Sequence, residues 1–169
     1  MKLPRALRVA TAAALAISLA APIVVLADPG TDSVRAHGLL QLTWDVDISA
    51  RSTPTGLGAS GHVTFSITTF DPDATFRGDV TCLRIVGGTA TAPATFYAVA
   101  RVTAAPPGST SQSIHVFGTD SGKFAQFPDT LEAFDSPALP NPDGTCPTSF
   151  PFVSRPLADG EVVINNVLP

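Results

Sequence analysis

The sequence predicts an all-β domain. Apolar and polar residues alternate with period two over several short stretches, which is the pattern of half-buried strands. Beyond residue 28 no apolar spacing of three and four residues persists over three helical turns, and Pro, Gly and Thr are frequent. Seven or eight short strands at fairly regular spacing are expected. The predicted fold is therefore an antiparallel β-sandwich, with a flattened β-barrel as the alternative.

The first 27 residues have the layout of a secretory signal peptide. Three basic residues precede an apolar run from Val9 to Leu26, and Val25 and Ala27 supply small residues at positions −3 and −1 of a cleavage site. We therefore expect a signal-peptide helix over 1–27, a single β domain over 28–169, and a protein that is secreted or otherwise extracytoplasmic. An uncleaved membrane anchor is the alternative, but the run is short for a span and contains Pro22.

The charge balance argues against two classes of partner. Three of the 10 basic residues precede residue 28 and all 14 acidic residues lie from Asp28 onward, so the mature chain has a net charge of −7. Nucleic acids and anionic membranes need basic patches on their partners. We expect neither as a partner.

Cys82 and Cys146 are the only cysteines. A pair in an exported chain indicates a disulfide, with two buried free thiols as the alternative. The bridge would close a loop of ~65 residues.

The first two strands are expected near the start of the mature chain. A strand over residues 40–48 is predicted by alternating Leu40, Leu42, Trp44, Val46 and Ile48. A connection rich in Gly, Ser, Thr and Pro follows over 51–61, and a second strand spans 62–69. Asp71-Pro72-Asp73 then marks a turn.

The third strand is expected from Val80 to Val86. The glycines at 87 and 88 predict a two-residue hairpin turn, with a return strand over 89–92. Further strands are expected over 95–103, 113–118 and 161–167, and residues 135–160 are Pro-rich and irregular. In the third strand the pleat places Leu83 inward and Cys82 outward, so the bridge would hold the segment around Cys146 against the outer side of the sheet.

The stretch from Gly78 to Thr91, GDVTCLRIVGGTAT, resembles a strand–turn–strand pattern, G-x-V-T-C-L-x-V-x-G-N, of secreted bacterial β-sandwich proteins of uncharacterised function. Asp120-Ser121-Gly122, Cys146 and Gly160–Ile164 match the later parts of the pattern. The resemblance covers about residues 35–167. It implies export and a β-sandwich or barrel, and it implies no activity or catalytic residue.

Asp71, Asp73 and Asp79 cluster around a turn, and oxygen ligands of this kind suit calcium. We take them as the candidate calcium site, with solvated carboxylates and Asx turns as the alternative. Asp45 and Asp47 share the water-facing side of one strand.

No catalytic residues are predicted. His37, His62 and His115 are scattered, without a spacing typical of zinc. Ser60 and His62 lie about 7 Å apart along an extended chain, too far for direct proton transfer. Separately from catalysis, Arg77-Gly78-Asp79 spells a tripeptide known as an integrin ligand, which must lie exposed at a loop tip to bind; here it runs straight into a strand, so we take it as a chance occurrence.

The expected function is that of a non-enzymatic structural or binding module at or outside the cell surface, with a surface protein or glycan as partner. A small secreted hydrolase and a barrel that carries an apolar ligand are the alternatives. Trp44 is expected in the core, and Tyr97 is expected to be exposed.

Overall fold

The computed structural model describes residues 30–40, 43–69, 74–88, 92–122, 128–147 and 154–166. These residues form nine strands and no helix. The strands are β1 (Asp32–Leu40), β2 (Trp44–Ser52), β3 (Ser60–Ile67), β4 (Ala74–Gly87), β5 (Ala94–Ala104), β6 (Ser113–Asp120), β7 (Thr130–Ser136), β8 (Arg155–Pro156) and β9 (Asp159–Asn165).

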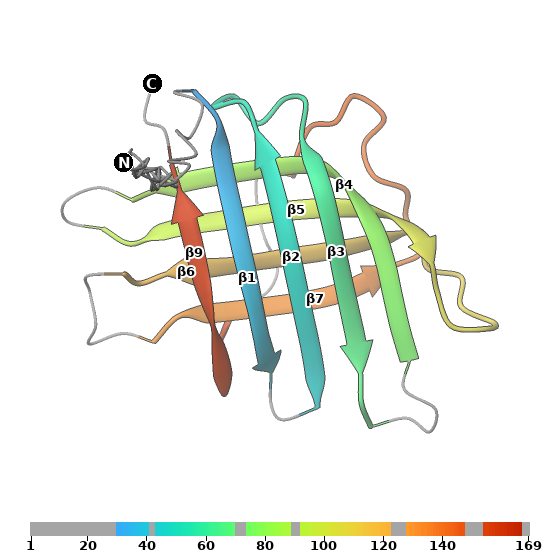
Figure 1. Cartoon of the computed structure of the whole chain (residues 1–169). Helices are drawn as coiled ribbons and strands as arrows, with labels where there is room; N and C mark the ends of the chain where they lie inside the picture. The colour runs from blue at the N-terminus through green and yellow to red at the C-terminus, as the bar shows by residue number, and fades with distance from the viewer. Residues whose placement is uncertain are drawn as a thin grey trace, which may run out of the picture.

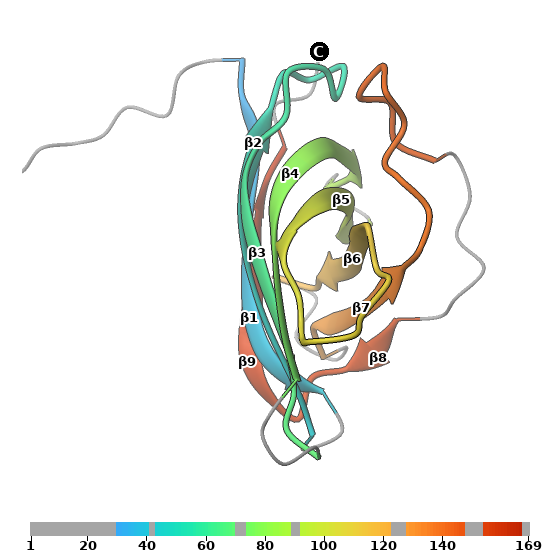
Figure 2. The same cartoon turned by 90° about the vertical axis from the view of Figure 1, so that its right-hand side faces the viewer.

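All nine strands belong to one antiparallel sheet, in the order β8-β7-β6-β5-β4-β3-β2-β1-β9. The sheet curls into a half-barrel, so that β1, β2, β3 and β9 lie in front of β5, β6 and β7 and cross them (Figure 1). Seen from the side, the two halves face each other across a common core (Figure 2). The all-β antiparallel prediction is confirmed, but the described strands form one curled sheet instead of the two separate sheets expected of a sandwich.

The corner between the two halves is the long strand β4. Its first part pairs with β3 and its second part with β5, with register shifts at Arg77/Gly78 and Val80/Cys82. A bulge bends a strand and reverses its inward–outward phase. Val80 and Leu83 therefore both enter the main core, while Cys82 lies on the opposite side of the sheet as predicted.

The expected strand over 40–48 is instead the end of β1, a turn and the start of β2. Leu40 pairs directly with Trp44 across the hairpin, so even-numbered residues point inward in both strands. The alternation passes through the turn without a break and cannot reveal it. This is why β1 was missed.

One other expectation about strands was wrong. Gly87 pairs with Ala94, so the chain returns as β5 after a connection longer than the two-residue turn expected at Gly87-Gly88. The segment expected to be mostly irregular over 135–160 is mostly outside strands where the structure describes it, and it includes only the end of β7, the two-residue β8 and the start of β9.

The C-terminal segment joins the two edges of the sheet. It pairs with β7 as β8, crosses over, and pairs with β1 as β9. On the other edge of β9 the backbone N–H of Val162 donates to Asp129 Oδ2 and that of Ile164 donates to Asp120 Oδ2, each at 2.9 Å. Two carboxylates beside the β6–β7 connection thus satisfy edge donors that would otherwise be free to pair with another chain.

The predicted signal segment, 1–27, lies outside the described residues. Within the described part of the chain no helix is long and apolar enough to cross a membrane.

Candidate functional site

A second, smaller core lies on the outer side of the sheet behind β4–β7. Cys82, Tyr97, Val99 and Phe117 are buried there, and Phe134 and Cys146 pack against them. Residues 137–147, which we call the strap, cover this side, and the Cys82–Cys146 disulfide ties the strap to β4 with the two Cα atoms 5.4 Å apart. Tyr97, expected to be exposed, is only 3% exposed because the strap and its disulfide cover that side.

The strap forms one wall of a groove of about 450 Å³, a size typical of small-ligand sites. The loop between β2 and β3 forms the other wall, and the end of β4 forms the floor. Figure 2 shows the loop and the strap rising at the same end of the sheet. The lining consists of Pro54, Thr55, Gly56, Leu57, Leu83, Arg84, Ile85, Val86, Gly144, Thr145 and Cys146.

In each wall, a glycine with a left-handed backbone conformation lies directly against β4. Gly56 (φ 79°) lies so close to β4 that a Cβ there would be 2.9 Å from the Leu83 carbonyl oxygen. Gly144 (φ 71°) approaches the Thr81 carbonyl, at 3.3 Å by the same measure. Only glycine combines this backbone conformation with such close approach at low cost, so the groove is a built feature of the fold.

Apolar side chains line the rim of the groove. Leu57 is 52% exposed and Val86 is 50% exposed, and they are two of four large hydrophobic residues that the structure describes as exposed. Leu57 belongs to the wall formed by the β2–β3 loop and Val86 to the floor, so apolar side chains line two sides of the groove. Arg84, two residues before Val86 on β4, is the one charged side chain among the described lining residues.

The outer core also contains a chain of hydrogen bonds through His115. The Tyr97 hydroxyl lies 2.5 Å from His115 Nδ1, and Ser113 Oγ lies 3.0 Å from His115 Nε2. The Ser113 hydroxyl donates to the Ala138 carbonyl of the strap at 2.7 Å. Because the Ser113 hydroxyl donates to Ala138, His115 Nε2 carries a proton and donates to Ser113, and in the neutral ring Nδ1 then accepts from the Tyr97 hydroxyl.

This direction is opposite to that of a serine nucleophile, in which the hydroxyl proton passes to the histidine. Ser113 is 1% exposed, and its hydroxyl donates a hydrogen bond to a backbone carbonyl. Burial lowers the pKa of His115, which favours the neutral ring, and raises the pKa of Tyr97 to about 12. The chain of bonds thus holds the strap to β5 and β6, and its donors are committed to structure.

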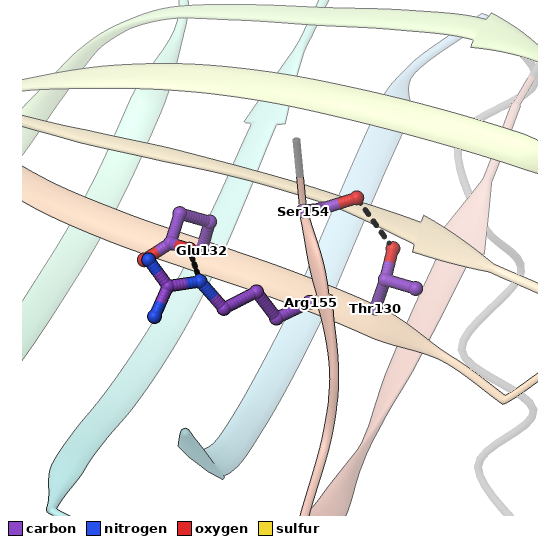
Figure 3. Close-up of polar contacts among 4 residues, drawn as sticks. All are labelled: Thr130, Glu132, Ser154 and Arg155. Atoms are coloured by element: carbon purple, nitrogen blue, oxygen red, sulfur yellow. Dashed lines mark hydrogen bonds and ion pairs between the residues drawn. The ribbon is translucent and has the colours of Figure 1, made fainter. Parts of the chain in front are cut away.

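A buried carboxylate lies further along the outer side of the sheet. Glu132 of β7, with its side chain 7% exposed, is paired with Arg155 of β8 at 2.8 Å, and Thr130 Oγ1 lies 2.8 Å from Ser154 Oγ (Figure 3). Burial raises the pKa of Glu132, and the Arg155 charge opposes that shift. The Arg155 guanidinium also lies 5.9 Å from the Trp44 ring centre. These contacts fasten the two-residue strand β8 to the edge of β7.

Several of the polar residues singled out from the sequence lie on the exposed face of the sheet half formed by β1, β2, β3 and β9. His37 faces Asp47 on one side and Glu161 on the other, beside a hollow of about 320 Å³. Asp45 is exposed on the same face. No group of three or more His, Cys, Asp or Glu side chains in the described ranges is arranged to hold a metal ion.

The candidate calcium site is only partly described. Asp79 is exposed on β4 between His62 and Arg101, whereas Asp71 and Asp73 lie outside the described residues. The site stays a prediction.

The structure separates the other residues that we considered for catalysis. Ser60 accepts a hydrogen bond from Arg51 Nε at 3.3 Å, and His62 faces Ser49 and Asp79 instead. Arg77, Gly78 and Asp79 lie within β4 and pair with strands on both sides, so this tripeptide is not at a loop tip.

The residues missed by the sequence analysis are those that a distant segment covers or completes. Ser113 and Glu132 carry no motif, and their burial depends on the strap and on β8. Arg84 could have been found, because the alternation already placed it on the outer face beside Cys82. Comparison of the chain with protein-family models, with curated proteins and with solved structures finds no match to any of them.

Proposed function

We propose that this protein is a non-enzymatic extracytoplasmic binding module whose ligand occupies the groove between the β2–β3 loop and the strap. The observation that carries the proposal is the groove itself, with apolar side chains on two sides and a positive-φ glycine of each wall lying against the same strand. The disulfide that ties down one wall is consistent with a location outside the cytoplasm.

The chemistry of the groove favours binding over catalysis. Among the described residues of the lining, Arg84 is the one ionisable side chain apart from the disulfide-bonded Cys146, so these residues offer no general base. The one Ser–His hydrogen bond found in the described part of the chain holds the strap. A hydrolase is therefore not favoured by the groove.

The test is a ligand screen followed by heteronuclear NMR on protein expressed from the full sequence and purified from the exported fraction. Cell-surface glycans, peptides and small organic acids are added in turn. We expect shift changes to cluster at Leu57, Val86 and Thr145. Leu57→Trp, which places a bulky ring at the mouth, should abolish them.

Leu139→Trp is the matched control, because Leu139 is 59% exposed and is not part of the groove lining. It should leave binding unchanged. Shift changes that map elsewhere, or binding that survives Leu57→Trp, would refute the groove as the binding site.

A further inference from the structure

Among the described side chains of the groove, the Arg84 guanidinium is the one hydrogen-bond donor that has no partner. Arg84 is exposed, and neither an ion pair nor a hydrogen bond joins it to any described residue. In the strap, Asp143 accepts hydrogen bonds from the backbone N–H and the hydroxyl of Thr145, which lower its pKa, and it forms no ion pair with Arg84.

The two hydroxyl groups of the lining and the backbone N–H groups of its two wall glycines have acceptors. The Thr145 hydroxyl donates to Asp143, and the backbone N–H groups of Gly56 and Gly144 donate to Thr53 O and Asn141 O. The Thr53 hydroxyl donates to Leu57 O, which leaves the Thr55 hydroxyl to donate to Thr53 Oγ1. Arg84 is therefore the charged side chain of the described lining that is available to a ligand, and a carboxylate matches a guanidinium in both charge and shape.

The rest of the ligand is constrained by the mixed character of the lining. Leu57 and Val86 offer a small apolar patch, and threonine side chains and glycine backbone interrupt it on both walls. A site for a long alkyl chain would be apolar throughout, whereas one aliphatic side chain beside a carboxylate fits this arrangement.

We propose that the groove binds the carboxyl-terminal residue of a peptide, with the terminal carboxylate on Arg84 and an aliphatic side chain between Leu57 and Val86. This inference rests on the proposed function, since it names the ligand of the same groove. It adds that the ligand is negatively charged and that Arg84 binds the charged group.

The test compares four probes by NMR titration: Gly-Gly-Leu, the same tripeptide as its amide, Gly-Gly-Gly, and octanoate. Gly-Gly-Leu should shift the amides of Leu57, Arg84 and Val86. The amide, which lacks the carboxylate charge, and Gly-Gly-Gly, which lacks the side chain, should each bind about five- to tenfold more weakly, because a charge-assisted hydrogen bond and a buried aliphatic group each supply interactions of this order. Octanoate should also bind more weakly than Gly-Gly-Leu.

Arg84→Gln should weaken Gly-Gly-Leu by about the same factor and leave the amide unaffected. Arg77→Gln, an exposed arginine of the same strand outside the groove, is the matched control and should change neither. Equal melting temperatures of the two variants show that both fold.

The outcomes separate the two proposals. Equal affinity for the tripeptide and its amide, or tighter binding of octanoate, overturns the peptide-carboxylate inference and leaves a binding groove in place. No groove shifts with any of these four probes also overturns the inference. Binding by other ligands of the wider screen would then decide whether the proposed function stands.

Discussion

Breaking the Cys82–Cys146 disulfide should cost about as much stability as truncating a large, fully buried core side chain. The bridge joins residues 64 positions apart, so it removes a large part of the chain entropy of the unfolded state. The chain-entropy relation gives ~4 kcal/mol for a loop of this length. The native contacts of the strap that remain, mainly the Ser113–Ala138 hydrogen bond and packing around Tyr97, cannot replace a covalent tether.

Urea unfolding followed by the fluorescence of Trp44 measures this loss. Trp44 is the single tryptophan and packs edge-on against Phe65 in the main core, with the ring centres 5.8 Å apart. Cys82→Ala/Cys146→Ala should lower the free energy of unfolding by about 4 kcal/mol relative to the oxidised protein. The reduced wild-type protein, which keeps every side-chain atom, is the control and should lose a similar amount. Oxidised and reduced proteins that differ by less than ~1 kcal/mol would refute the entropic argument.

Three further predictions follow from particular contacts. Gly56→Ala should destabilise the fold by about 1–2 kcal/mol more than Gly58→Ala in urea unfolding, because both have positive φ but only at Gly56 would a Cβ meet a β4 carbonyl, at 2.9 Å. The lowered pKa of His115 means that the unfolded chain binds its proton more readily, so stability should fall as pH drops below ~6.5, and His115→Gln should flatten this part of the pH–stability curve. Arg155→Gln should lower the free energy of unfolding by about 1–2 kcal/mol at pH 7, less than for a fully buried ion pair because Arg155 is 44% exposed. The raised pKa of Glu132 means that this carboxylate takes up a proton in the folded protein before it does in the unfolded chain, so the loss of stability should shrink as pH falls toward 4. An equal loss at both pH values would contradict this reasoning.

The alternation of residues predicted which side chains face the core more reliably than it predicted where strands begin and end. Val46 and Ile48 are buried, and Leu83 and Cys82 lie on opposite sides of β4, as expected. The β1–β2 turn escaped detection because Leu40 and Trp44 are cross-strand partners, so the inward positions keep the same parity on both sides of the turn. Period-two alternation reports the side of the sheet and not the direction of the chain.

The groove could be predicted only in part. Alternation placed Arg84 and Val86 outward beside Cys82, and the pair of cysteines indicated that a Pro-rich segment would lie nearby. The opposite wall is the β2–β3 loop, whose approach to β4 depends on Gly56 and on the pairing of β3 with β4. Neither the volume of the groove nor the lack of a partner for Arg84 among the described residues follows from local sequence, since both depend on segments about 30 and 60 residues away.

By itself, the sequence determined the strand character of the chain, the face on which its apolar side chains gather, and the side of β4 on which Cys82 lies. These are properties of a residue and its near neighbours, because the pleat and the turn residues act over a few positions. The tertiary structure alone decided that the strands form one curled sheet, that Asp120 and Asp129 bind the free edge of β9, and that Tyr97 is covered. Each of these depends on contacts between segments far apart in the chain, which the local pattern of residues does not encode.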